Sequence, residues 1–151
     1  QRYLSPDRGL EELGAPLRKA SGFVLYSLAP FPRNFYEREG KEVPEEELHG
    51  YPVYGSVTIS DKGEREMIIE AVRASALANN GSIAACFNPR HGIRVPYGEG
   101  FLDILICFQC RRLRAIGFEE RYSLAISMVG RETLNSILDA HNIYREDPTK
   151  G

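Results

Sequence analysis

The stretch from Cys86 to Cys110, CFNPRHGIRVPYGEGFLDILICFQC, constrains the fold more than any other part of the chain. Two extended runs flank the turn-forming sequence Pro-Tyr-Gly-Glu, which is typical of a β-hairpin. We expect paired strands at 82–91 and 101–111 around a turn at 96–99. Because successive side chains of a strand point to opposite faces, the hairpin should have one apolar and one mixed face. The expected apolar face consists of Ile83, Ala85, Phe87, Leu102, Ile104, Ile106 and Phe108.

The register of this hairpin decides which cysteines meet. With the turn centred on residues 96 and 97, Cys86 lies opposite Cys107, and a cross-strand disulfide between them is expected. A register shift of two residues keeps the faces but separates these thiols. A three-residue turn with a bulge exchanges the faces and places Cys86 beside Cys110 instead.

The rest of the chain contains further strand and helix patterns. Strands are expected at 21–28, at 51–60 with Gly55 as a bulge, and at 121–129. Ser60 or Asp61 should cap a helix running to about residue 78, closed by Asn79, Asn80 and Gly81. A second helix should bury Leu134, Ile137 and Leu138. At the N-terminus, Gly14 and Pro16 interrupt the pattern that follows Ser5-Pro6-Asp7, so only a short helical turn is expected there.

This order of elements predicts an α+β fold. We expect an antiparallel sheet of about 4–5 strands with helices packed on one face, in a single domain spanning residues 1–151. Residues 29–50 contain three prolines and an acidic cluster, which indicates a Pro-rich, acidic loop insertion. Residues 145–151 are polar and are expected to form a frayed tail.

Charge and hydropathy exclude several classes of partner. The formal net charge is −2 and the pI is near 6.0, so no strong overall field attracts nucleic acid. No apolar run approaches the ~20 residues of a transmembrane helix. The sequence also lacks Gly-rich phosphate loops, nucleophile elbows and zinc-protease helices. A protein partner, with no nucleic acid and no transmembrane segment, is therefore expected.

The three cysteines and His91 admit three interpretations. The first is structural, with small thiols filling the sheet or forming a disulfide. The second is a Cys₃His zinc site from Cys86, His91, Cys107 and Cys110, although 107 and 110 point to opposite faces of a regular strand. The third is a thiol-dependent enzyme or redox protein that uses Cys86 or Cys107 with His91. The C-x₂-C pair differs from the thioredoxin type because no helix begins after it. Apart from zinc, no cofactor is expected.

We favour a non-enzymatic binding or accessory domain that uses the polar face of the 82–111 hairpin, together with the 29–50 loop. An ion pair between Arg90 and Asp103 is expected to fix the hairpin tip. Gln109 and Arg111 should offer hydrogen bonds to the partner, and His91 completes the binding set. Arg111 also begins a short basic run with Arg112 and Arg114, which is expected to face water or an acidic partner.

The motif CFNPRHGIR followed by DILICFQC, with GYPVYGSVTISD before it, resembles a family of bacterial proteins for which no activity is known. The resemblance covers residues 50–113. It implies no catalytic residue, but it groups Cys86, Arg90, His91, Cys107 and Cys110. Many members of the family resemble exported or lipid-anchored proteins, which agrees with a chain that begins at Gln1. The resemblance therefore implies export to the cell envelope rather than a cytoplasmic location, with a lipid anchor upstream as an option.

Overall fold

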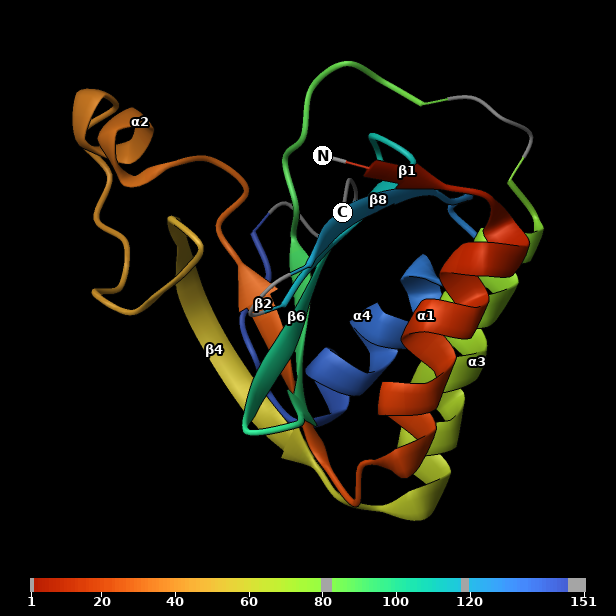
Figure 1. Cartoon of the computed structure of the whole chain (residues 1–151). Helices are drawn as coiled ribbons and strands as arrows, with labels where there is room; N and C mark the ends of the chain where they lie inside the picture. Colours follow the sequence, from red (N-terminus) through yellow and green to blue (C-terminus); the bar gives the residue numbers. More distant parts are fainter. Residues whose placement is uncertain (1, 80–82, 118–119, 147–151) are drawn as a thin grey trace.

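The structure is a computed structural model and describes residues 2–79, 83–117 and 120–146 (Figure 1). Its strands are β1 (Arg2–Leu4), β2 (Phe23–Leu28), β3 (Glu47–Leu48), β4 (Tyr51–Ile59), β5 (His91–Tyr97), β6 (Gly100–Cys107), β7 (Arg112–Ile116) and β8 (Arg121–Ala125). Its helices are α1 (Pro6–Lys19), α2 (Arg33–Arg38), α3 (Lys62–Leu77) and α4 (Arg131–Ala140).

The eight strands form one curled sheet in the order β1-β8-β7-β6-β5-β2-β4-β3. β1 runs parallel to β8, whereas all other neighbours are antiparallel, so the sheet is mixed. Figure 1 shows the resulting half-barrel. The expectation of an antiparallel sheet of 4–5 strands is therefore wrong, although α+β remains the broad class. Of the added strands, β3 and β7 pair with their sequence neighbours across short turns, and β1 pairs with the distant β8, a contact that local patterns do not encode.

Helices α1, α3 and α4 cover one face of the sheet (Figure 1). The main core lies between these helices and the sheet and contains the inward side chains of β5, β6 and β7. Leu102, Ile104, Ile106 and Phe108 belong to this core, as the sequence predicts. Leu134, Ile137 and Leu138 of α4 also point inward, as expected. We call the opposite side of the sheet the outer face. It carries a smaller apolar cluster of Tyr26, Leu28, Leu48, Val53 and Leu105.

The capping residue expected for α3 is confirmed, whereas the helix-breaking residues in α1 do not end that helix. Asp61 caps α3, because its carboxylate accepts a hydrogen bond from the backbone N–H of Glu64 at 2.9 Å. α1 is a 14-residue helix that contains both Gly14 and Pro16, so the expectation of a short turn is wrong. The apolar side chains of its inner side are buried in the core, and tertiary packing outweighs the local helix-breaking signals.

The hairpin exists, but its first strand is displaced. β5 begins at His91, and residues 83–90 form no regular structure, so the strand expected at 82–91 is wrong over residues 83–90. The turn lies at Gly98, which has a φ of +59°, and Tyr97 faces Gly100. This register places Arg94, rather than Arg90, opposite Asp103. Asp103 thus faces a residue four positions later than expected, which keeps the two faces of β6 and moves Cys86 away from Cys107 in the ladder.

Two other segments also differ from their sequence patterns. Residues 29–50, expected as an irregular loop, contain the short helix α2 and the two-residue strand β3. The register between β2 and β4 shifts between Ser27 and Leu28, opposite Gly55 and Val53, which confirms an irregularity near Gly55.

The expected helix stop at Asn80 and Gly81 lies outside the described residues, as does the tail at 147–151. None of the helices in the described ranges is long and apolar enough to cross a membrane.

Candidate thiol–disulfide site

Cys107 and Cys110 form a disulfide across the turn that joins β6 to β7. Cys107 is the last residue of β6, and Arg112, the first of β7, pairs with it in the sheet. Arg111 closes the turn in the left-handed backbone conformation, with a φ of +57°. The backbone N–H of Cys110 donates to Cys107 Sγ over 3.0 Å. Both cysteines are buried, each only 1% exposed.

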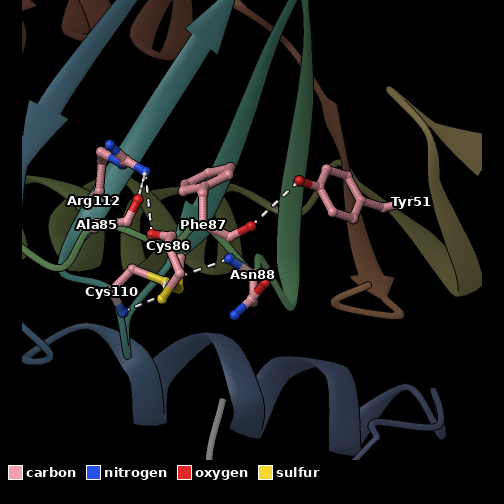
Figure 2. The surroundings of a disulfide bond; sticks show 8 residues. Tyr51, Ala85, Cys86, Phe87, Asn88, Cys110 and Arg112 are labelled. Carbon is pink, nitrogen blue, oxygen red and sulfur yellow. Dashed lines mark hydrogen bonds between the residues drawn. A yellow bond between two sulfur atoms is a disulfide. The ribbon is translucent and has the colours of Figure 1, made fainter. Parts of the chain in front are cut away.

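Cys86 is free and exposed, and it lies directly beside this disulfide. Its Sγ atom is 3.9 Å from Cys110 Sγ (Figure 2). The backbone N–H of Asn88 also donates to Cys110 Sγ, over 3.4 Å. The three sulfur atoms therefore form one cluster in which Cys86 is the member open to solvent. The expected Cys86–Cys107 disulfide is wrong, because Cys107 is bonded to Cys110.

Hydrogen bonds hold the irregular segment 83–90 against the sheet. Ala84 N–H donates to Cys110 O over 2.9 Å. Farther along, the Tyr51 hydroxyl of β4 donates to Phe87 O over 3.4 Å, and Leu28 N–H donates to Arg90 O over 3.0 Å. The segment is therefore tied to the sheet at both ends, which positions Cys86 without strand pairing.

Arg112 fixes the backbone around Cys86 from the other side. Its Nη2 atom donates to Cys86 O over 3.1 Å and to Ala85 O over 3.4 Å (Figure 2). Its Nη1 atom donates to the Tyr3 hydroxyl over 2.9 Å. The side chain is buried, so these neutral acceptors replace the water that the guanidinium loses.

Phe87, the residue after Cys86, connects Arg112 to Arg114. The guanidinium carbon of Arg112 lies 5.3 Å from the centre of the Phe87 ring, and that of Arg114 lies 4.2 Å away. Both distances allow cation–π attraction. Two positive charges therefore lie against the side chain that follows Cys86 in the sequence.

His91 is not part of the thiol cluster. It pairs with Ile106 at the start of β5 and faces the helices, whereas Cys107 faces the other way. Its Nε2 atom donates to Asn135 Oδ1 of α4 over 2.7 Å, and its ring packs edge-on against Phe108. Burial lowers the pKa of His91 to about 4. This imidazole is a neutral core side chain and is not placed to activate Cys86 or Cys107.

Asp103 lies on the outer face but belongs to a separate polar cluster. Arg94 binds it through two hydrogen bonds, 2.8 Å to Oδ1 and 2.9 Å to Oδ2, and His49 Nε2 donates to Oδ2 over 2.8 Å. Burial raises the pKa of Asp103, but the hydrogen bonds from Arg94 and His49 outweigh burial and hold the pKa below its usual value. The expected Arg90–Asp103 pair is wrong, because Arg94 occupies that position.

The remaining expected binding residues are dispersed. Gln109 is exposed and Arg111 half-buried, both in the turn that carries the disulfide. Arg90 is half-buried, and its Nε atom is buried without a hydrogen-bond partner. The structure thus brings Gln109 and Arg111 to the thiols and leaves His91 and Asp103 elsewhere.

The Cys₃His zinc set is not assembled in this arrangement. Within residues 2–79, 83–117 and 120–146, no three His, Cys, Asp or Glu side chains are grouped to hold a metal ion. Two of the expected ligands are joined in the disulfide, and His91 is bonded to Asn135.

Arg112 and Arg114 are expected to face water or an acidic partner, but both lie against the segment that carries Cys86, and Arg112 is buried. A signal for the arginines was present, because residues 112 and 114 alternate with Leu113 and Ala115 and therefore share the outer face. The expected place of Phe87 on the core face is wrong: it lies in an irregular segment and packs against the outer-face cluster.

Comparisons with protein-family models, curated proteins and solved structures return no match for this chain. The chemistry of the site therefore rests on its own geometry. A thiol next to a disulfide can undergo thiol–disulfide exchange, in which a thiolate attacks one sulfur of the disulfide and displaces the other.

Proposed function

We propose that this chain is a thiol–disulfide exchange domain, in which the exposed Cys86 connects a partner to the buried Cys107–Cys110 disulfide. One observation carries the proposal: Cys86 Sγ lies 3.9 Å from Cys110 Sγ, while both bonded cysteines are buried. A partner in solution can reach Cys86, whose sulfur in turn contacts the sulfur of Cys110.

The internal step needs no outside oxidant. The Cys86 thiol loses its proton, and its sulfur attacks Cys110 Sγ. The Cys86–Cys110 bond forms as the Cys107–Cys110 bond breaks, and the Cys107 sulfur leaves with the electron pair and takes up a proton. The number of disulfides is unchanged, and the disulfide now includes an exposed sulfur.

Exchange with a partner dithiol then completes a two-electron transfer. The first partner thiolate attacks Cys86 Sγ, forms a mixed disulfide and releases the Cys110 thiolate, which takes up a proton. The second partner thiolate then attacks the first partner sulfur in the mixed disulfide and releases the Cys86 thiolate, which takes up a proton. The partner leaves with a disulfide, having lost two electrons and two protons, and the domain holds three thiols. The reverse sequence oxidises the domain.

The test follows reduction of the oxidised domain by dithiothreitol, with acid quenching, alkylation and intact mass measurement. Cys86→Ser should slow reduction of the Cys107–Cys110 disulfide by about tenfold or more, because direct attack on a buried disulfide requires local opening. Ser136→Ala on α4 is the control, since Ser136 is exposed and on the helical side.

Urea unfolding first shows that each variant is folded, so that a change in the reduction rate cannot come from unfolding. A folded Cys86→Ser domain reduced at the wild-type rate would refute the proposal, because Cys86 would then be irrelevant to exchange. Slow reduction of Cys86→Ser, with the control at the wild-type rate, would support it.

A further inference from the structure

Arg112 is a buried cation held only by neutral groups. Its side chain bonds the Tyr3 hydroxyl and two backbone carbonyls, and its Nε atom is buried without a hydrogen-bond partner. No carboxylate in the described ranges forms an ion pair with it. Buried charges in proteins are usually paired, so this positive charge is not compensated locally.

Arg114 repeats this situation two residues farther along β7. It lies on the same face as Arg112, its Nε atom is buried and unpartnered, and its guanidinium stacks on Phe87. It too has no ion-pair partner in the part of the chain that the structure describes. The Phe87 ring keeps these guanidiniums beside the segment that carries Cys86 without neutralising either charge.

Arg94 on the same face serves as an internal comparison. Its guanidinium also lies over an aromatic ring, that of Phe101, but it forms a bidentate ion pair with Asp103. The fold therefore neutralises Arg94, whereas the two arginines that contact Phe87 have no acidic partner among the described residues. The chain as a whole carries a net charge of −2, so the positive charge around Phe87 is a local feature.

Resting on the proposed exchange function, we infer that the substrate of Cys86 is an anionic thiol or disulfide, with a carboxylate close to its reacting sulfur. Arg114 and Arg112 attract the carboxylate and hold it beside Phe87. The reacting sulfur of the substrate then lies over Cys86. Arg114 acts as a positioning residue and takes no part in the transfer of electrons.

The test measures modification of Cys86 in the oxidised domain by disulfides of different charge. The anionic probe is 5,5′-dithiobis(2-nitrobenzoate), the neutral probe is 2,2′-dithiodipyridine and the cationic probe is cystamine. Each rate constant is divided by that for N-acetylcysteine amide, which removes the intrinsic reactivity of the reagent. The normalised rate should be about tenfold higher for the anionic than for the cationic probe at low salt, and the difference should shrink at high salt.

Variants that change the charge at residue 114 test whether Arg114 causes the preference of Cys86 for the anionic probe. Arg114→Gln should reduce the anionic preference about fivefold, and Arg114→Lys should retain most of it. Arg73→Gln makes the same change in net charge on α3, on the helical side of the sheet, and should leave the preference unchanged. Urea unfolding of each variant checks that it is folded.

The outcomes distinguish the inference from the function on which it rests. Equal normalised rates for all three probes, or a preference untouched by Arg114→Gln, would overturn the anionic substrate while leaving exchange at Cys86 intact. A Cys86 that reacts with none of the probes would overturn both. Peptide disulfides flanked by Glu or by Lys distinguish a polypeptide source from a small molecule: a larger charge preference with the peptides assigns a polypeptide.

Discussion

Acid should destabilise this fold through His91, at a pH above that at which Asp103 and Asp139 are protonated. The ring is completely buried, and its neutral form donates Nε2–H to Asn135 while Nδ1 is buried without a partner. Protonation would place a second N–H and a full charge in the core. Burial is the main cause that lowers the pKa of His91 to about 4, and the neighbouring charges of Arg145, Arg90 and Arg131 lower it further.

The sign and size of the effect follow from proton linkage. Between pH 6.5 and 4 the unfolded chain binds a proton at His91 and the folded chain does not, so stability falls as pH falls. A pKa of about 4 against 6.5 lowers the free energy of unfolding by about 2 kcal/mol between pH 7.5 and 5. The loss reaches about 3 kcal/mol below pH 4. The carboxylates of Asp103 and Asp139 have lowered pKa values, so their contributions are lost below this window.

Urea unfolding at pH 7.5, 6 and 5, at constant ionic strength, measures the effect. His91→Gln should be less stable at pH 7.5 because it loses packing against Phe108, but its stability should change little between pH 7.5 and 5. His141→Gln is the matched control, since His141 is an exposed residue that pairs with Glu64. A wild-type protein equally stable at pH 5 and 7.5, or a His91→Gln variant with the full wild-type slope, would refute the reasoning.

Two further substitutions, with Arg73→Gln as a control, test contacts outside the thiol cluster. Arg94→Gln should lower the free energy of unfolding by about 2 kcal/mol, because Asp103 remains charged and buried with His49 as its remaining partner. Arg73→Gln, which breaks an exposed pair, should cost less than about 1 kcal/mol in the same urea titration. Gly130→Ala should cost about 2 kcal/mol, because its Cβ would lie 2.5 Å from the backbone oxygen of Ala71 and α4 would have to move away from α3. Similar stability of wild type and Arg94→Gln, or of wild type and Gly130→Ala, would show that these contacts are not formed as described.

Local patterns predicted the elements that carry their own signals. The helix α3 has an Asp61 cap and an apolar stripe, and β6 alternates cleanly between a core face and an outer face. The strand β5 was misplaced because HGIRVPY contains Gly, Arg and Pro, whereas the preceding SIAACF is the more apolar run. Gly98 in the left-handed conformation fixed the register, and the sequence around it allowed more than one turn length.

The sequence indicates which cysteines form the site but not how they are arranged. Cys86, Cys107 and Cys110 do come together, yet Cys86 arrives on an irregular segment and not by strand pairing. The pairing of Arg112 with the carbonyls of that segment is a long-range contact, and no periodicity encodes it. The mixed sheet has the same origin, because β1, at residues 2–4, pairs with the distant residues 122–124 of β8. The non-enzymatic binding role expected for the polar face of the hairpin remains a prediction.

The contact between Cys86 and Cys110 is the central claim, and one variant tests it directly. Cys107→Ser removes the present disulfide and leaves Cys86 Sγ beside Cys110 Sγ. After oxidation by glutathione disulfide, peptide mapping should find a Cys86–Cys110 disulfide in this variant. Cys86→Ser, treated in the same way, should retain Cys107–Cys110. A folded Cys107→Ser protein that keeps Cys86 and Cys110 as separate thiols, or as separate glutathione adducts, would contradict the account.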